Sequence, residues 1–331
     1  MSTFSDAIPK AELHLHIEGS LEPELMFKIG KRNGIKMPFS SVEQVKQAYR
    51  FHNLQSFLDI YYQGASVLLM EEDFYDMTLA YLEKCHEQNI VHTEMFFDPQ
   101  THTARGVPFE TVINGIETAR KEAASRWNIS SLLIMCFLRH LDENSAMACL
   151  KQALPYRDKI IGIGLDSSEL GNPPEKFARV FEAAEWEGFR AVAHGGEEGP
   201  PEYIRQCLDV LHVSRIDHGV RSIEDKALVE RLAREQIPLT ACPLSNIRLC
   251  VFENMEDHPI FSLLGENVLV TVNSDDPAYF GGYINENFTA LEQAFQLDRE
   301  TVRTLAVNSF RASFLPQSRK EDYISEVQNF S

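Results

Sequence analysis

Short apolar runs with strand character recur along the chain, and longer segments of helical periodicity separate them. Segments such as Pro201–Val213 and Ile223–Glu235 repeat apolar residues every three or four positions, which is typical of amphipathic helices. Ser222 is expected to cap the second of these helices. The pattern predicts eight strands, at Glu12–Ile17, Val91–Phe97, Leu132–Leu138, Ile160–Leu165, Phe189–Ala193, Ser214–Asp217, Pro238–Cys242 and Val268–Val272. Eight strands alternating with helices predict an α/β fold, the (β/α)8 TIM barrel.

The spacing of the predicted strands indicates one domain with a helical insertion. No Ser/Gly-rich or Pro-rich spacer divides the 331 residues, so we expect a single barrel domain over residues 1–331. The widest gap, about seventy residues after the first strand, contains helical segments that include Leu54–Leu69. An insertion there would cover the carboxyl-terminal face of the barrel as a lid, or pack outside the barrel. The pattern leaves both arrangements open.

Charge and cysteine content narrow the partners and the compartment. The chain has 31 Lys and Arg against 49 Asp and Glu, a formal net charge of −18. This surplus repels polyphosphates and anionic lipids, so we expect neither a nucleic-acid nor a membrane partner. The six cysteines form no C-x-x-C pair, and the first nine residues do not resemble a signal peptide. We therefore expect a cytoplasmic protein.

Two histidines on the first predicted strand are the first indication of chemistry. Residues two apart on a strand share a face, so His14 and His16 point together while Leu13 and Leu15 point the other way. A His-x-His pair on a strand can chelate Zn²⁺ through neutral ring nitrogens. The alternative is a hydrogen-bonded pair in a polar barrel mouth.

Three further strand ends carry polar side chains, and these favour the metal. His194, His218 and the Asp275-Asp276 pair follow the fifth, sixth and eighth runs, where a barrel of this class has its active site. Since His14, His16, His194 and Asp275 supply three nitrogens and one oxygen, they form a credible zinc set. Glu197 and His218 are then the candidate proton-transfer pair beside a metal-activated water, which indicates hydrolysis. The fourth run has no lysine at its carboxyl end, so we expect one metal per chain.

The order of these motifs resembles the adenosine/adenine deaminase branch of the amidohydrolase superfamily. The resemblance is carried by Pro9-Lys-Ala-Glu-Leu-His-Leu-His16, His194-Gly-Gly-Glu197, Asp217-His218-Gly219, Cys242-Pro-Leu-Ser-Asn246 and Asn273-Ser-Asp-Asp-Pro277. It implies a zinc barrel that replaces the C6 amino group of a purine by oxygen, with water as nucleophile.

The same resemblance implies roles for individual residues. His14, His16, His194 and Asp275 would hold Zn²⁺, with Fe²⁺ as the alternative ion. Glu197 would protonate purine N1, His218 would orient or deprotonate the attacking water, and Asp276 would bind N7.

Three segments resemble the bacterial and fungal subgroup that acts on the free base adenine. They are Gly164–Pro174, Phe96–His102 and Gly196–Glu202. In this interpretation Glu169 would occupy the position of the ribose and accept a hydrogen bond from N9–H. The expected reaction is therefore the conversion of adenine to hypoxanthine and ammonia, with a neutral purine base as substrate. Adenosine deamination, another mononuclear amidohydrolase reaction and a non-catalytic metal-binding barrel remain the alternatives.

Overall fold

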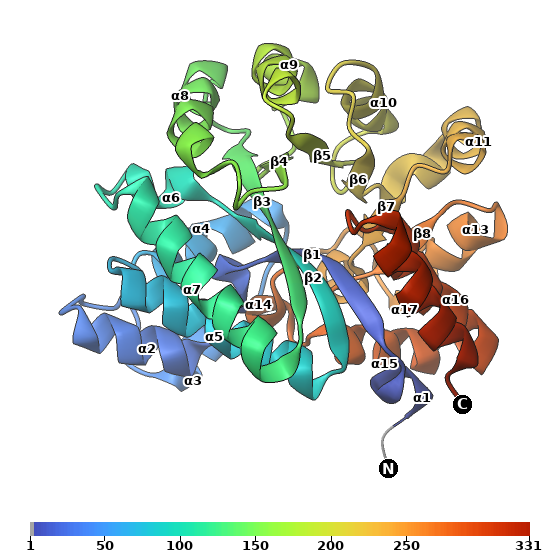
Figure 1. The fold of residues 1–331 in the computed structure, drawn as a ribbon, viewed down its shortest axis with the longest axis horizontal. Helices are drawn as coiled ribbons and strands as arrows, with labels where there is room; N and C mark the ends of the chain where they lie inside the picture. The colour runs from blue at the N-terminus through green and yellow to red at the C-terminus, as the bar shows by residue number, and fades with distance from the viewer. Residues whose placement is uncertain (1–2) are drawn as a thin grey trace.

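Eight parallel strands, joined in chain order, curve into a barrel, as the computed structural model of residues 3–331 shows (Figure 1). Met1 and Ser2, the first residues of the segment in which we expect no signal peptide, lie outside the described residues. The strands are β1 (Lys10–His16), β2 (Ile90–Phe97), β3 (Ser130–Leu138), β4 (Gly162–Asp166), β5 (Arg190–Gly195), β6 (Arg215–His218), β7 (Leu239–Ala241) and β8 (Val270–Val272). Each expected run overlaps one of these strands, and the predicted fold class is confirmed.

One short helix precedes the first strand, and the others lie between consecutive strands and after the last one. The predicted insertion between β1 and β2 is present and contains η1 (Glu18–Ser20), α2 (Pro23–Arg32), α3 (Val42–Ala48), α4 (Leu54–Ala65) and α5 (Glu71–Glu87). The other connections contain α6 (Pro99–Thr103), α7 (Phe109–Trp127), α8 (Glu143–Ala153), η2 (Leu154–Tyr156), η3 (Pro174–Phe177), α9 (Ala178–Trp186), α10 (Pro201–Asp209), η4 (Val220–Glu224), α11 (Lys226–Glu235), α12 (Pro243–Arg248), η5 (Met255–Asp257) and α13 (Ile260–Gly265). The terminal helices are α1 (Phe4–Ala7), α14 (Pro277–Phe280), α15 (Ile284–Phe295), α16 (Arg299–Ala312) and α17 (Gln317–Asn329). Within residues 3–331, no helix combines the length and apolar character needed to cross a membrane.

The expected cap of α11 was wrong. The helix begins at Lys226 because the Asp225 carboxylate accepts the Leu228 N–H at 3.1 Å, whereas Ser222 lies inside the preceding 3-10 turn. Asp and Ser are both good caps, and the turn that precedes the helix decides between them.

The seam between β8 and β1 closes the barrel partly through a side chain. The Asn273 side-chain oxygen accepts the Leu13 N–H at 2.9 Å, in the position where a neighbouring strand would offer a carbonyl. Beyond it, the His16 N–H donates to the Asp275 carbonyl at 3.0 Å, and the Asp275 N–H donates to the His14 carbonyl at 3.1 Å. The first and last strands are therefore joined at the end where the predicted metal ligands lie.

Two apolar regions lie on opposite sides of the barrel wall. The larger lies between strands and helices and includes Leu13 and Leu15, while a small cluster around Phe96 and Ile134 fills part of the barrel interior. The His14 ring packs edge-on against Phe96 at 5.0 Å, so the expected alternation along β1 is observed. The interior is thus available for polar groups.

A buried ion pair occupies the barrel interior. Arg215 donates to Glu94 at 2.5 Å and to the Leu13 carbonyl at 3.1 Å, and its guanidinium lies 4.7 Å from the Phe314 ring centre. Burial opposes ionisation of Glu94, but Arg215 together with His92 and the Phe314 N–H outweighs it and lowers the pKa of Glu94 to about 2. Both side chains are inaccessible to solvent.

Replacement of Glu94 by Gln is expected to reduce the free energy of unfolding by about 3–5 kcal/mol, because it leaves the Arg215 charge buried without its partner. Chemical denaturation at pH 7 measures this loss. Since the folded pKa lies below the ordinary 4.5, the Glu94 carboxylate stabilises the fold above pH 4.5 and loses that effect as pH falls toward 2. The difference in the free energy of unfolding between wild type and variant should therefore become smaller as pH falls through that range.

The matched control is Glu87→Gln, which removes an exposed partner of Lys84 and should cost less than about 1 kcal/mol. Equal losses in the two variants would contradict the importance of the interior pair.

Candidate metal centre and active site

The structure brings the predicted ligands together at the carboxyl ends of the strands. The His16 Nε2 atom lies 3.1 Å from His194 Nε2, and Asp275 Oδ1 lies 3.3 Å from His14 Nε2 and 3.6 Å from His16 Nε2. All four side chains are at least nine-tenths buried. Bonds of 2.0–2.1 Å in a tetrahedral zinc site place neighbouring donor atoms about 3.3 Å apart. The separations fit a divalent metal ion.

His218 lies in the same cluster but approaches the other oxygen of Asp275. Donor atoms of His14, His194, His218 and Asp275 lie within 4.8 Å of one another, and those of His16, Asp275 and Asp276 form a second such group. His218 Nε2 is 3.7 Å from Asp275 Oδ2, which also accepts the Ser245 hydroxyl at 2.6 Å. Oδ1, in contrast, faces His14 and His16. Each carboxylate oxygen of Asp275 thus faces different imidazole rings.

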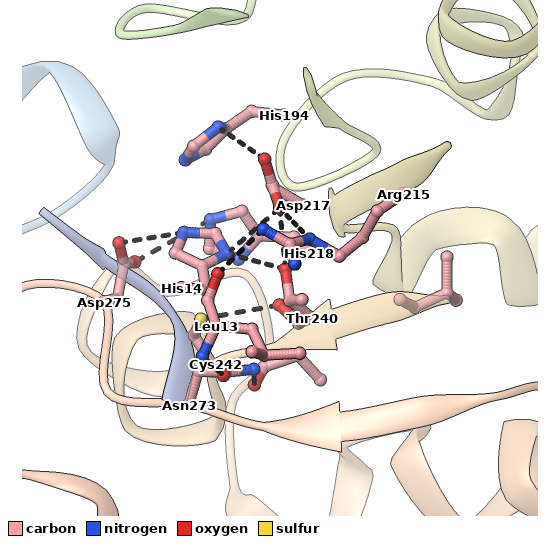
Figure 2. A network of polar contacts seen from close by, with 12 residues as sticks. Leu13, His14, His194, Arg215, Asp217, His218, Thr240, Cys242, Asn273 and Asp275 are labelled. Carbon is pink, nitrogen blue, oxygen red and sulfur yellow. Dashed lines mark hydrogen bonds and ion pairs between the residues drawn. The ribbon is translucent and has the colours of Figure 1, made fainter. Parts of the chain in front are cut away.

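Hydrogen bonds behind His14 determine which of its nitrogens is free. The Thr240 hydroxyl donates to Asp217 at 2.9 Å and therefore accepts from His14 Nδ1 at 2.8 Å (Figure 2). The His14 proton is on Nδ1, and the lone pair of Nε2 points into the cluster. That Nε2 atom is buried and has no hydrogen-bond partner among the described residues. Carboxylates also lie near the Nδ1 atoms of His16 and His194, namely Asp166 at 3.4 Å and Asp217 at 3.8 Å.

Backbone turns at two strand ends aim the side chains inward. His218 and Asp275 have φ of 61° and 63°, a left-handed conformation that is uncommon for residues other than glycine. His218 is the last residue of β6, and Asp275 follows shortly after the end of β8. Such strain is typical of functional sites.

The carboxyl groups of the site differ in charge. Burial alone would raise the pKa of Asp275, but the adjacent imidazoles, His14 foremost, hold it well below its ordinary value. Burial, and then the Asp275 charge, raise the pKa values of Glu197 and Asp276 well above theirs. The surroundings therefore favour the carboxylate form of Asp275 and the protonated forms of Glu197 and Asp276, which can donate hydrogen bonds. Glu197 Oε1 lies 3.6 Å from His218 Nε2.

The Glu169 carboxylate lies against the backbone of the loop that bears Glu197. Its Oε1 atom accepts the Gly196 N–H at 2.7 Å, and Oε2 accepts the N–H groups of Glu197, Glu198 and Gly199 at 2.7–3.1 Å. The side chain is outside the set of residues that lines the cavity. These hydrogen bonds make Glu169 a clamp on the loop that bears Glu197, and its predicted contact with the substrate stays a prediction.

A partly open cavity lies over the cluster, and the empty space within it and at its mouth, open solvent included, is about 370 Å³. Its polar wall includes His16, His194, Glu197, His218, Asp275 and Asp276. Leu54, Phe57, Leu58, Tyr61 and Tyr62 of α4 form the opposite wall, so the insertion covers the site. Two contacts hold α4 in place: the Leu54 N–H donates to Glu198 at 2.9 Å, and the Tyr62 and Ser167 hydroxyls are 2.9 Å apart. Of the two open arrangements, the structure shows the covering one.

Asp98 and Asp166 also line the cavity, and our sequence interpretation gave them no role. They stand at the ends of β2 and β4, so extending the strand-end rule to every strand would have included them. Asp98 Oδ1 and both oxygens of Asp166 lack a hydrogen-bond partner within residues 3–331. Unpaired buried carboxyl oxygens at a cavity wall are available to a ligand that carries N–H groups.

Comparison with known proteins assigns this arrangement to a family. The family model described as "Adenosine deaminase" matches residues 9–330. The chain is 62% identical over 330 residues to an adenine deaminase of Hahella chejuensis, covering 100% of this chain and 99% of that protein. It is similar to the crystal structure of an adenine deaminase from Arthrobacter aurescens, with a TM-score of 0.96 and 50% identity over 97% of this chain and 98% of the other. An amidohydrolase from Burkholderia ambifaria with bound Zn gives a TM-score of 0.90 and 25% identity over 98% of this chain and 91% of the other.

Replacing Glu169 with Gln should release the loop it holds. An amide offers one acceptor oxygen and turns its NH2 group toward backbone N–H donors, so several of the four hydrogen bonds must be lost. We expect the amides of residues 196–199 to exchange with solvent deuterium about tenfold faster or more. Glu202→Gln, an exposed change on the neighbouring helix, should leave their exchange unaltered. Unchanged protection in Glu169→Gln would contradict the clamp.

Proposed function

The chain belongs to the adenosine deaminase family, and from that premise we propose that it hydrolyses adenine at C6 to hypoxanthine and ammonia. One observation carries the proposal: a single cavity joins a metal-compatible donor set to Glu197, whose pKa is raised, and to His218. These groups match the two needs of hydrolysis at an aromatic C–N bond, which are an activated water and a proton donor to the ring.

The resident ion is Zn²⁺, one per chain, with His14, His16, His194 and Asp275 as ligands. The mixed nitrogen and oxygen donors suit zinc, as does the approach of His14 and His16 to the same oxygen of Asp275. The structural relative from Burkholderia ambifaria has bound zinc. Zinc lowers the pKa of water in contact with it, so that a nucleophile is present at neutral pH.

Glu197 supplies the proton that the ring requires. Attack at C6 places negative charge on the purine unless N1 is protonated first. Burial and the Asp275 charge keep the Glu197 carboxyl protonated, and its Oε1 atom lacks a partner in the described chain, so it is ready to donate to N1. His218, 3.6 Å away, lies where it can contact the attacking water.

Asp276 recognises N7 from the same side of the cavity. Its raised pKa makes it a hydrogen-bond donor, and N7 of adenine offers only a lone pair. The backbone of Gly19 packs against this carboxyl so closely that a Cβ atom there would lie 1.9 Å from Asp276 Oδ1. Glycine at this position keeps Asp276 directed into the cavity.

Adenine is the substrate rather than its nucleoside or nucleotide. The free base carries an N9–H donor, and Asp98 and Asp166 place buried carboxyl oxygens in the same cavity. Burial raises the pKa of both groups, but a protonated carboxyl still accepts a hydrogen bond at its carbonyl oxygen. A nucleoside replaces that donor with carbon and would leave an acceptor unpaired. No Lys or Arg is among the described residues that line the cavity, so the phosphate of AMP would have no cationic partner.

An ammonia-release assay with adenine, adenosine and AMP, together with metal analysis of the same sample, tests this assignment. We expect adenine to be deaminated at least about a hundredfold faster than adenosine, and AMP to be inert. Zinc should be present at one per chain. Equal or faster turnover of adenosine would overturn the substrate assignment. Activity that persists after complete removal of metal by a chelator would overturn the metal assignment.

Glu197→Gln is expected to retain the metal and the fold while turnover of adenine falls by about 10²–10⁴-fold, since the amide cannot protonate N1. Steady-state kinetics and metal content measure the two effects. Glu230→Gln, an exposed change on α11, is the control and should match wild type. A Glu197→Gln protein with normal kcat would count against the proton-donor role.

A further inference from the structure

A series of three hydrogen bonds links the backbone of α13 to the side chain of His218. The Ile260 N–H donates to His258 Nδ1 at 3.2 Å, His258 Nε2 lies 3.1 Å from Asn246 Oδ1, and Asn246 Nδ2 lies 3.3 Å from His218 Nδ1. All three side chains are at least 97% buried. Asn246 and His258 have no role in the site as described so far.

The direction of every hydrogen bond in this chain follows from its first member. A backbone N–H can only donate, so His258 Nδ1 accepts and carries no proton. Burial lowers the pKa of His258 to about 3, so the ring is neutral and its single proton is on Nε2. That proton is donated to Asn246 Oδ1, and the amide NH2 of Asn246 must then face His218.

His218 is therefore an acceptor at Nδ1 and, as a neutral ring, carries its proton on Nε2. This Nε2–H points at the reaction site, 3.6 Å from Glu197 Oε1 and 3.7 Å from Asp275 Oδ2. An N–H in this position can donate to the oxygen of the attacking water but cannot remove its proton. Of the two roles that the resemblance implied for His218, this geometry selects orientation.

We propose that His258, acting through Asn246, is a positioning residue that holds His218 with its ring proton on Nε2. The inference deepens the proposed function, on which the catalytic consequence rests, but the tautomer itself is a property of the folded chain. It also explains the Cys242–Asn246 motif, because Ser245 donates to Asp275 while the next residue supports His218. One short helix, α12, thus orients two groups of the site.

Asn246→Asp is the sharpest test, because it changes one atom of the link and keeps its shape. The aspartate still accepts from His258 Nε2–H but now also accepts from His218, so the His218 proton should move to Nδ1. Nitrogen NMR of the zinc-loaded, ¹⁵N-histidine-labelled protein reports which ring nitrogen is protonated, and loss of the signal in His218→Gln assigns it. We expect kcat to fall by about a hundredfold or more with KM within about threefold.

Variants at His258 separate positioning from simple packing. His258→Gln retains an N–H donor for Asn246 and should keep most of the activity and the His218 Nε2 proton, whereas His258→Leu should lose both. Asn329→Asp on the exposed end of α17 is the control for an added charge.

A wild-type His218 protonated on Nδ1, or an unchanged tautomer in Asn246→Asp, would overturn the inference even if the enzyme deaminates adenine. Conversely, wild-type protein that fails to release ammonia from adenine, yet shows the expected tautomers, would overturn the proposed function alone.

Discussion

Closure of the barrel between its first and last strands is the constraint on which the site depends. The seam is made by residues of the metal-compatible cluster themselves, because His14 and His16 exchange backbone hydrogen bonds with Asp275. Asn273, two residues earlier, completes the seam with its side chain. A displacement of β8 relative to β1 would therefore separate the proposed ligands at the same time as it opens the wall. The geometry of the site therefore depends on the same hydrogen bonds that close the barrel.

Burial of many carboxyl groups in one cavity gives them different protonation states. The formal net charge of −18 counts every Asp and Glu as ionised and says little about this interior, where burial weakens the screening of charges by water. The imidazoles keep Asp275 ionised, and its charge in turn favours the protonated forms of Glu197 and Asp276. Neighbouring carboxyl groups of similar chemistry thereby suit different proposed roles, Asp275 as a metal ligand and Glu197 and Asp276 as hydrogen-bond donors.

The barrel and most of the cluster could be predicted from the sequence because both depend on local patterns. Alternation placed His14 and His16 on one face, and strand ends located His194 and Asp275. The partners of Glu169 could not be predicted, since they are backbone N–H groups 27–30 residues further along the chain. A sequence motif indicates that a residue is functionally important, whereas only the three-dimensional structure shows which atoms it contacts.

Other features were absent from the prediction because no local pattern marks them. The interior pair of Glu94 and Arg215 joins residues 121 positions apart. His258 precedes α13 without any periodic signal, and its importance follows only from its contact with Asn246. Asp98 and Asp166 are ordinary strand-end residues when each is considered alone. Only the structure shows that both line the same cavity.

The seam also determines when the site can form during synthesis. Its contacts connect residues at least 259 positions apart, and the Ala11 N–H donates a hydrogen bond to the Ser309 hydroxyl near the end of the chain. While the ribosome is still extending the chain, β1 can pair with β2 but has an unpaired edge on its other side. His14 and His16 are among the first residues made, yet they meet Asp275 only after nearly all the protein has emerged. The geometry of the proposed metal site is therefore a late product of translation, and a truncated chain lacking β8 and Asp275 would have neither a closed wall nor the full set of proposed ligands.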